Sequence, residues 1–308
     1  MMKYLIVFDC GATKTECALT DINGKILYTT TGSAANFLVT GTDGTSRIIL
    51  SQINDCIRKF NIDYSEIEKI VIGAAGVGRK KDAEKLESSL LEIFSADGID
   101  IKSLKVVSDA HIALQGAFPN EAGCILIAGT GSIIYGKDEK GNIYRNGGFG
   151  RLLGDEGSGF SIGKKGLQAA AKYFDGRGVE TLIVKLIEEK YSIRTADELI
   201  AKVYKENFDI ASVAEVVIIA AKNEDQIAYH ILLEESEELI HHIRTMMNKM
   251  HTIDLRVSFA GSLISNNNIY SDMLRDKITT SLPSVKIVEP RHSPIEGALL
   301  LAKELLND

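Results

Sequence analysis

The sequence predicts an α/β protein built from two copies of one folding unit. Three short strands separated by turns occupy residues 3–31, and the same order of strands and turns returns at residues 123–148. In each half, helical segments that alternate with two further apolar strands follow this triplet. Strands that alternate with helices are typical of a parallel sheet covered on both faces. Each half is therefore expected to fold as β-β-β-α-β-α-β-α.

The first half supports this order segment by segment. Its triplet reads KYLIVF, ECALT and KILYTTT, in which β-branched, aromatic and aliphatic residues dominate, and Asn23-Gly24 supplies a turn between the last two strands. Helices are expected over residues 45–60 and 79–94, and from residue 110. The strands KIVIGAAGV and LKVVSD separate these helices.

The second half repeats the plan with more helix. Its triplet lies within GCILIAGTGSIIYGKDEKGNIYRNGG, helices are expected from Gly163 to about His251, and two strands follow as DLRVSFAG and VKIVEP. A last helix over residues 294–306 carries apolar residues at helical spacing. No linker rich in Pro, Ser or Gly separates the halves, which predicts close packing with a cleft between them.

The composition indicates a soluble globular protein with a small-molecule partner. The chain has 308 residues, of which 45% are hydrophobic, so it can bury a large core and is long enough for two domains. A formal charge of -7 without a dense Lys/Arg block argues against nucleic acid or an anionic membrane as partner. A secretory signal and a membrane-spanning stretch are both absent, and the four cysteines form no CxxC pair. These features predict a cytoplasmic protein with reduced thiols.

Two turns that contain glycine and threonine stand at matching places in the repeat, at residues 11–15 and 129–132. Backbone N–H groups that glycines leave free, with hydroxyl groups beside them, form a cradle suited to phosphates. Lys14 adds a positive charge for a terminal phosphate. Either stretch alone could be an ordinary hairpin turn, but their paired occurrence favours phosphate binding.

Two aspartates end apolar strands. Asp109 ends LKVVSD at the sheet edge where ligands bind, and the sequence leaves open whether it serves a ligand or caps the helix that begins at Ala110. Asp9 ends the first strand opposite a phosphate turn, where it could hold Mg²⁺ through water. One aspartate near a metal ion and one near an acceptor hydroxyl are the minimum for phosphoryl transfer to an alcohol.

The segment GGFGRLLGDEGSGFSIG, residues 147–163, contains seven glycines in 17 residues. It surrounds Asp155 and Glu156 and stands just before a helix. Glycines allow the backbone to approach a ligand closely, although they could also serve crossing chains. The carboxylates between the glycines favour a binding loop.

Six motifs in order resemble the BadF/BadG/BcrA/BcrD ATPase family, and within it the N-acetylglucosamine kinases. They are DCGATKTECAL, SDAHIALQGA, IAGTGSIIYG, GGFGRLLGDEGSGFSIG, FAGSLISN and RHSPIEGALLLA, and together they cover essentially the whole chain. The resemblance implies the actin-like ATPase fold, a ribonuclease H-like fold in which duplicated domains surround a central cleft. It implies an N-terminal sugar and phosphate domain at residues 1–118 plus 295–308, and a C-terminal nucleotide-binding domain at 119–294.

By position in these motifs, the resemblance implies a site for ATP and a site for a sugar. The residues expected at ATP are Gly11, Thr13, Lys14, Thr15, Gly129, Thr130, Gly131, Gly261 and Ser262. The residues expected at the sugar are Asn36, Asp109, Ser132, Gly148, Phe149, Gly150 and Asp155. Asp109 becomes the expected catalytic base, and Asp9 the expected residue near Mg²⁺.

The activity that the resemblance implies is ATP-dependent phosphorylation of the 6-hydroxyl of an N-acetylated amino sugar. N-acetylglucosamine is the first candidate. Phe149 stands where the family has Trp, and Ile133 where it has Asn. The smaller side chain leaves room for N-acetylmuramic acid, which would give the protein a role in cell-wall recycling. A homodimer is also expected.

Two alternatives stay open at this point. One is a glucosamine kinase. The other is an ATPase that activates a radical dehydratase by delivering an electron from an iron–sulfur cluster, which requires cysteine ligands at a subunit interface. The KCAAGTG pattern of such activators reads here as LIAGTGS, and Cys124 lies inside an apolar strand. A binder without catalytic activity is less favoured, because Asp109 and both phosphate turns are present.

Overall fold

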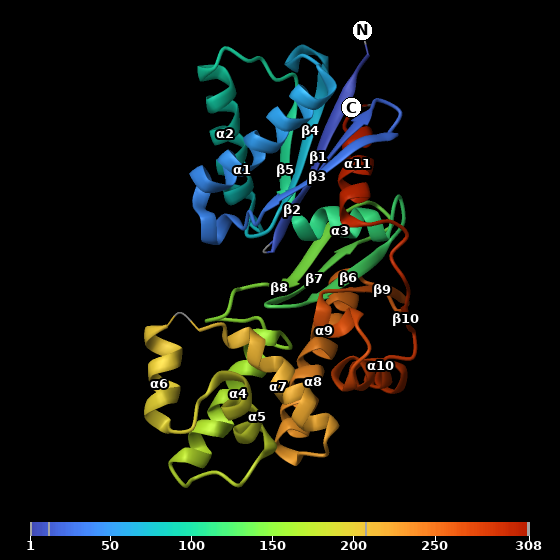
Figure 1. Cartoon of the computed structure of the whole chain (residues 1–308). Coiled ribbons are helices and arrows are strands. Elements are labelled where there is room, and N and C mark those ends of the chain that lie inside the picture. The colour runs from blue at the N-terminus through green and yellow to red at the C-terminus, as the bar shows by residue number, and fades with distance from the viewer. Residues whose placement is uncertain (1, 12, 207, 307–308) are drawn as a thin grey trace. The chain divides into compact units, whose positions relative to one another are not determined.

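The chain folds into two compact units, whose elements are labelled in Figure 1. The structure is a computed structural model, and it describes residues 2–11, 13–206 and 208–306. Unit 1 comprises Met1–Glu121 and Glu289–Asp308, and unit 2 comprises Ala122–Val288. Each unit contains its own five-stranded sheet.

The segment that rejoins unit 1 begins at Glu289, before the boundary predicted at residue 295. The backbone N–H of His292 donates to the carbonyl of Gly116 at 3.0 Å, near the end of helix α3 (Asp109–Ala117). The residues just before helix α11 (Pro294–Glu304) are therefore already hydrogen-bonded to unit 1.

The unit 1 sheet has the strand order β3-β2-β1-β4-β5. Strands β1, β2 and β3 pair antiparallel, whereas β4 and β5 run parallel to β1. The strands are β1 (Tyr4–Cys10), β2 (Lys14–Asp21), β3 (Ile26–Ser33), β4 (Ile67–Ala74) and β5 (Leu104–Ser108). The carboxyl ends of the three parallel strands therefore meet at one edge.

Helices cover both faces of this sheet. Side chains alternate between the two faces along each strand, so each strand contributes apolar residues to both faces. Ile6 and Phe8 pack in a cluster with helices α1 (Phe37–Phe60) and α2 (Lys80–Ala96). Leu5 and Val7 pack in a second cluster with α3 and α11, which lie side by side in Figure 1. The turn before β4 is a short 3-10 helix, Tyr64–Glu66.

Helices α3 and α11 approach closely through glycine. A Cβ atom on Gly297 of α11 would lie 2.0 Å from the carbonyl oxygen of Ile112 on α3, a distance that no side chain tolerates. A Cβ atom on Gly116 of α3 would likewise lie 2.6 Å from the carbonyl oxygen of Ser293. The C-terminal helix is thereby fixed against the helix that Asp109 begins.

The unit 2 sheet has the order β10-β9-β6-β7-β8. In the reverse direction, β8-β7-β6-β9-β10, this order corresponds strand for strand to β3-β2-β1-β4-β5 of unit 1. The strands are β6 (Gly123–Ala128), β7 (Ser132–Lys137), β8 (Ile143–Gly147), β9 (Leu255–Ala260) and β10 (Val285–Ile287). Strand β9 runs parallel to β6 and to β10, and β7 pairs antiparallel with its neighbours. The predicted duplication of the β-β-β-α-β-α-β-α unit is confirmed.

Several helices stand where the second repeat needs only one. They are α4 (Gly159–Phe174), α5 (Leu182–Tyr191), α6 (Ala196–Lys205), α7 (Val213–Lys222) and α8 (Gln226–Lys249), with a 3-10 turn at Ile210–Ser212. After β9 come the short α9 (Ser262–Ser265) and then α10 (Ile269–Ser281). These helices and the sheet share one apolar core. Within the described part of the chain, no helix is long and apolar enough to cross a membrane.

Helix α1 starts earlier than the sequence analysis expects, at Phe37 rather than near residue 45. Asn36 caps its first turn, with the side-chain oxygen accepting the N–H of Leu38 at 3.0 Å. Gly41 then breaks the helical geometry with φ of 67°. This kink hides the helical period of the first turn from sequence reasoning.

Candidate active site

The first glycine turn, residues 11–14, joins β1 to β2 and leaves two polar side chains in solvent. The N–H of Gly11 donates to the carbonyl of Lys14 at 2.9 Å, which closes the turn. Thr13 and Lys14 are exposed, and the Lys14 ammonium lies 3.1 Å from the Glu16 carboxylate. Exposed ion pairs contribute little free energy, so Lys14 can exchange Glu16 for a phosphate at small cost.

Thr15 differs from the expectation that it contacts ATP. It is fully buried on β2, and the Gln52 side chain donates to its backbone carbonyl at 3.3 Å. Residues that alternate with exposed positions on a strand face the core, and Thr15 lies on the same face as the buried Cys17 and Leu19. The side chain of Thr15 therefore packs inside unit 1, and Thr13 and Lys14 are the accessible side chains of this turn.

Asp9 and Asp109 stand at the same edge of the unit 1 sheet. Asp9 pairs in register with Gly73 of β4. Strand β4 pairs onward with β5, whose last residue, Ser108, directly precedes Asp109. Strands β1, β4 and β5 are parallel, so their carboxyl ends lie at the same edge of the sheet. Asp9 near the end of β1 and Asp109 just after β5 therefore both lie at this edge, where α/β sheets bind ligands.

Both carboxyl groups hold protons more tightly than a free aspartate. Burial, together with repulsion from Asp109 and Glu16, raises the pKa of Asp9 to about 6, although Lys14 acts in the opposite direction. Burial also raises the pKa of Asp109, against backbone N–H groups that favour its ionised form. A nearby divalent cation would relieve this repulsion, so the two carboxylates fit a Mg²⁺ site.

The donor set also limits how such a cation is held. Among the described residues, His, Cys, Asp and Glu side chains form no group of three or more that could hold a metal ion. Mg²⁺ commonly keeps several waters and binds through one or two carboxylates together with substrate phosphates. Asp9 suits that mode of binding, in which water completes the coordination.

The structure separates the two interpretations of Asp109 that the sequence leaves open. Ser108 is the N-cap of α3, and its hydroxyl oxygen accepts the N–H of His111 at 3.1 Å. Asp109 is the first helical residue, and its carboxylate accepts the N–H of Ala110 at 2.8 Å. The capping interpretation is therefore wrong, and the Asp109 carboxylate stays partly exposed at the sheet edge.

Asn36 lies at the start of α1 with one end of its side chain engaged. The oxygen caps the helix through Leu38, and Gly76 packs so closely that a Cβ atom there would lie 2.7 Å from this oxygen. Gly76 has φ of 86°, so the loop after β4 requires glycine at that point. The side-chain nitrogen of Asn36 donates to no described residue and can serve a ligand oxygen.

The second glycine turn, residues 129–131, joins β6 to β7 and is docked on the start of α4. The N–H of Gly159 donates to the carbonyl of Gly129 at 2.8 Å, and the N–H of Phe160 donates to the carbonyl of Thr130 at 3.2 Å. These donors belong to the first residues of a helix, where N–H groups lack partners within the helix. The start of α4 therefore holds both carbonyls of the turn.

This docking orients the donors of the turn. In a planar trans peptide the N–H points opposite to the carbonyl, and the described chain has no cis peptide bond. Because the carbonyls of Gly129 and Thr130 face α4, the N–H groups of Thr130 and Gly131 face away from it. The Thr130 side chain is exposed beside them. Two parallel amides and a hydroxyl are suited to hold phosphate oxygens.

Gly261 and Ser262 join this turn from the end of β9. A Cβ atom on Gly261 would lie 2.3 Å from the carbonyl oxygen of Ala128, so only glycine allows this close approach. Gly261 has φ of 86° and precedes Ser262, the exposed first residue of α9. The expected nucleotide residues of unit 2 are therefore assembled around the second glycine turn.

Asp155 fixes the glycine-rich loop to the same turn. Burial raises its pKa, whereas N–H groups of Gly150 and Ser132 favour the ionised form, as does the charge of Arg145. A Cβ atom on Gly131 would lie 2.9 Å from Oδ2 of Asp155. The Asp155 backbone is left-handed, with φ of 63°. The carboxylate thus connects the loop to the turn.

The other residues expected at the sugar divide into buried and exposed groups. Ser132 is buried, and its hydroxyl donates to the carbonyl of Glu156 at 2.5 Å, so it supports the loop. The N–H of Gly148 donates to the carbonyl of Ser132 at 3.1 Å. Phe149 is 65% exposed and Gly150 is exposed. Phe149 and the backbone around it are the accessible part of the loop.

Two residues that support the loop were not predicted from the sequence. The Arg145 guanidinium on β8 donates to the carbonyl of Gly148 at 2.5 Å and so holds the start of the loop. Glu235 on α8 is buried and accepts the N–H of Gly157 at 2.5 Å. A signal for Glu235 exists, because it stands at helical spacing between the apolar Ile231 and Leu239.

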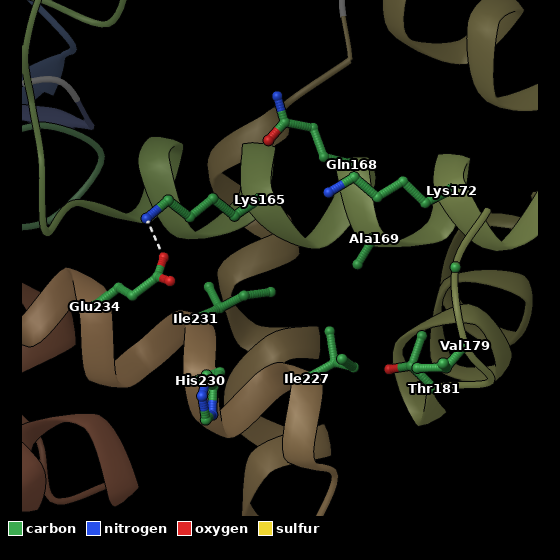
Figure 2. Close-up of a pocket in the computed structure, with 11 residues that line it drawn as sticks. Lys165, Gln168, Ala169, Lys172, Val179, Thr181, Ile227, His230, Ile231 and Glu234 are labelled. Carbon is green, nitrogen blue, oxygen red and sulfur yellow. Dashed lines mark hydrogen bonds and ion pairs between the residues drawn. The ribbon is translucent and has the colours of Figure 1, made fainter.

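A cavity of about 350 Å³ lies elsewhere on unit 2, as Figure 2 shows. Apolar side chains of Ala169, Ile227 and Ile231 line it, with Lys165 and Glu234 paired at one end. The expected site residues are not among those that line this cavity. The candidate residues therefore lie in each unit separately, at the sheet edge and first glycine turn of unit 1 and around the second glycine turn of unit 2.

The chain belongs to the BadF/BadG/BcrA/BcrD ATPase family, which it matches over residues 8–302. It is 31% identical over 307 residues to the N-acetylmuramic acid/N-acetylglucosamine kinase of Clostridium acetobutylicum, covering 98% of this chain and 99% of that protein. It is 29% identical over 313 residues to the N-acetyl-D-glucosamine kinase of Dictyostelium discoideum, covering 96% and 97%.

A solved structure also shares the fold. The crystal structure of a Chromobacterium violaceum protein assigned as an N-acetylglucosamine kinase matches with a TM-score of 0.78 at 24% identity, over 98% of this chain and 99% of that one. The family resemblance and the actin-like ATPase fold class that the motifs predict are thereby confirmed.

Replacement of Asp9 by Asn tests the cost of burying a charge at the sheet edge, to which repulsion from Asp109 and Glu16 adds. A folded-state pKa raised from the ordinary value to about 6 means that the wild-type protein loses stability as the pH rises from about 4 to about 6, and does not regain it above. In chelator at about pH 7.5, the free energy of unfolding of Asp9→Asn should therefore exceed that of the wild type by an amount on the order of 1–2 kcal/mol, and the variant should unfold at a higher temperature. Thermal unfolding followed by circular dichroism measures the difference.

The same comparison at about pH 4 is the internal control, because Asp9 is protonated there and the two proteins should differ little. Addition of Mg²⁺ at neutral pH should stabilise the wild type more than Asp9→Asn. An Asn variant that is less stable than the wild type at neutral pH would mean that the Asp9 carboxylate is a stabilising partner and not a repelled charge.

Proposed function

We propose that this protein is an ATP-dependent kinase that phosphorylates the 6-hydroxyl of an N-acetylated amino sugar. The observation that carries the proposal is the Asp109 carboxylate, which stands at the ligand-binding edge with Asp9 and does not serve as a helix cap. Membership of an ATPase family supports the use of ATP. Similarity along nearly the whole chain to proteins named as amino-sugar kinases supports the choice of acceptor.

ATP would be held mainly through backbone donors. The N–H groups of Thr130 and Gly131, which face away from α4, suit phosphate oxygens, and the Thr13 and Lys14 side chains offer a hydroxyl and a charge. Gly261 and Ser262 stand beside the second glycine turn and are assigned to the nucleoside side. Bound Mg²⁺, held near Asp9 through water, would neutralise charge on the phosphates.

Asp109 is assigned as the general base. Its raised pKa brings the carboxylate nearer to the basicity that proton transfer at neutral pH requires. In the proposed reaction the sugar hydroxyl oxygen bonds to the γ-phosphorus as the bond from that phosphorus to the bridging oxygen breaks. The hydroxyl proton passes to Asp109, and ADP leaves with the electron pair of the broken bond.

The sugar would be recognised by a few fixed polar groups and one apolar wall. The side-chain nitrogen of Asn36 is available for a hydroxyl, and the backbone of Gly148 and Gly150 offers further polar atoms. Phe149 is exposed and gives a flat surface for the acetyl group or the ring face. Asp155 stands behind this loop. Because Phe149 is smaller than Trp, we include N-acetylmuramic acid among the substrates.

Electron delivery to a radical dehydratase, the second candidate function, is disfavoured by the cysteines. All four cysteines are buried, and none of them forms a disulfide. Burial also raises the pKa of the Cys124 thiol, which opposes the thiolate form that an iron–sulfur cluster needs. Homodimer formation, a cytoplasmic location and a role in cell-wall recycling stay predictions from the sequence.

Replacement of Asp109 by Asn should abolish turnover and leave binding intact. The amide has nearly the shape of the carboxylate but does not accept the proton, so kcat should fall by about 10² to 10⁴ while the KM values for sugar and ATP change little. Steady-state kinetics and calorimetric binding measure both. Ser108→Ala is the matched control, since loss of the true cap should cost about 1 kcal/mol of stability without this loss of kcat. Retention of more than about a tenth of kcat in Asp109→Asn would remove Asp109 from the mechanism.

A panel of sugars tests the acceptor. ADP release coupled to a reporter enzyme should be fastest with N-acetylglucosamine and N-acetylmuramic acid, and slow with glucosamine and glucose. A site that hydrogen-bonds an acetamido group rejects analogues that leave those partners unpaired. N-acetylmannosamine controls for stereochemistry at the 2-position. If glucosamine or glucose gives the highest kcat/KM, the N-acetyl assignment is wrong, and if no sugar stimulates ADP release, the kinase assignment is wrong.

A further inference from the structure

We infer that Glu235 is a positioning residue that sets the orientation of the second glycine turn toward ATP, an inference that rests on the proposed function. Glu235 lies on α8 and is only 1% exposed. Burying a carboxylate costs free energy of folding unless several hydrogen-bond donors compensate its charge. The donors around Glu235 therefore indicate its role. All of the partners described below belong to one short segment of the chain.

The Glu235 carboxylate binds the segment that leads into α4. It accepts the N–H of Gly157 at 2.5 Å and the hydroxyl of Ser161 at 2.8 Å. It also lies 2.9 Å from the ammonium of Lys165, one turn further along α4. Figure 2 shows that Lys165 also reaches Glu234, which is largely exposed.

Gly157 is held from its other side as well. The hydroxyl of Tyr270, which is fully buried, donates to the carbonyl of Gly157 at 2.8 Å. A Cβ atom on Gly157 would lie 2.4 Å from Cδ2 of Leu239, and its φ of 79° also requires glycine. The peptide groups on both sides of Gly157 are therefore fixed by α8 and α10.

This fixed point is connected directly to the proposed phosphate donors. Two and three residues after Gly157, the N–H groups of Gly159 and Phe160 hold the carbonyls of the second glycine turn. These carbonyls determine which way the N–H groups of Thr130 and Gly131 point. A shift at Gly157 would therefore rotate the donors that the proposal assigns to ATP, whereas the Asn36 side chain of unit 1 would keep its contacts.

Replacement of Glu235 by Gln tests this role. The amide still fits the space and can accept one hydrogen bond, but it loses the charge that Lys165, Gly157 and Ser161 share. Calorimetric titration with ATP, without sugar, should give a Kd raised by about 10-fold to 100-fold, because small displacements of binding groups have effects of this size. The KM for N-acetylglucosamine should rise by a clearly smaller factor than the Kd for ATP, because Asn36 of unit 1 keeps its contacts and only the loop that carries Asp155 is shared with Gly157.

Two further variants make the test specific. Glu234→Gln is the matched control, because it neutralises the adjacent residue and the same ion pair with Lys165 but has no bond to Gly157. Its Kd for ATP should equal that of the wild type. Ser161→Ala removes one Glu235 contact at the start of α4, and it should weaken ATP binding in the same direction by a smaller factor even if Glu235→Gln does not fold.

The outcomes separate this inference from the proposed function. Wild-type protein that binds no ATP would refute the ATP site and, with it, the role of Glu235. If the wild type binds ATP but Glu235→Gln and Ser161→Ala bind it equally well, Glu235 only stabilises the fold and the inference is overturned. Equal increases in the KM for ATP and for the sugar would overturn it too, because a general loss of structure affects both substrates.

Discussion

The burial of two carboxylates at one sheet edge is the constraint on which the proposed chemistry depends. Parallel pairing of β1, β4 and β5 fixes where Asp9 and Asp109 stand, and burial there raises the pKa of both groups. An arrangement that resists ionisation is unfavourable for folding by itself. In phosphoryl transfer to an alcohol, a divalent cation can neutralise one carboxylate and the acceptor hydroxyl can give its proton to the other. The same arrangement then serves the proposed reaction.

The two repeats share a fold but carry different halves of the chemistry. By strand register, Ile127 of β6 occupies the place of Asp9 in β1. Unit 2 therefore lacks the Asp9 carboxylate at this place. What it has instead is a turn whose carbonyls are held by the start of α4, so that its N–H groups are free for phosphate. The two repeats therefore share a scaffold, while the residues at the ends of their first strands differ.

The features that follow from local pattern were predictable, and those that depend on distant partners were not. The strand triplets and both glycine turns follow from period-2 alternation and turn residues, which act within a few positions. The burial of Thr15 depends on which face of β2 meets α1, and the N-cap at Ser108 competes with Asp109 one residue away. Glu235 lies 78 residues from Gly157, so nothing local reveals their contact. Its position within an apolar helical stripe was the available sign.

The position of the transferred phosphate on the sugar distinguishes the proposed reaction from other sugar phosphorylations. Phosphorus–proton correlation NMR of the product made from N-acetylglucosamine and ATP reports which sugar carbon carries the phosphate. We expect the product phosphorus to correlate with the two protons on carbon 6, because the assigned acceptor is the 6-hydroxyl activated by Asp109. Correlation with the anomeric proton, or the absence of any phosphorylated sugar, would contradict it.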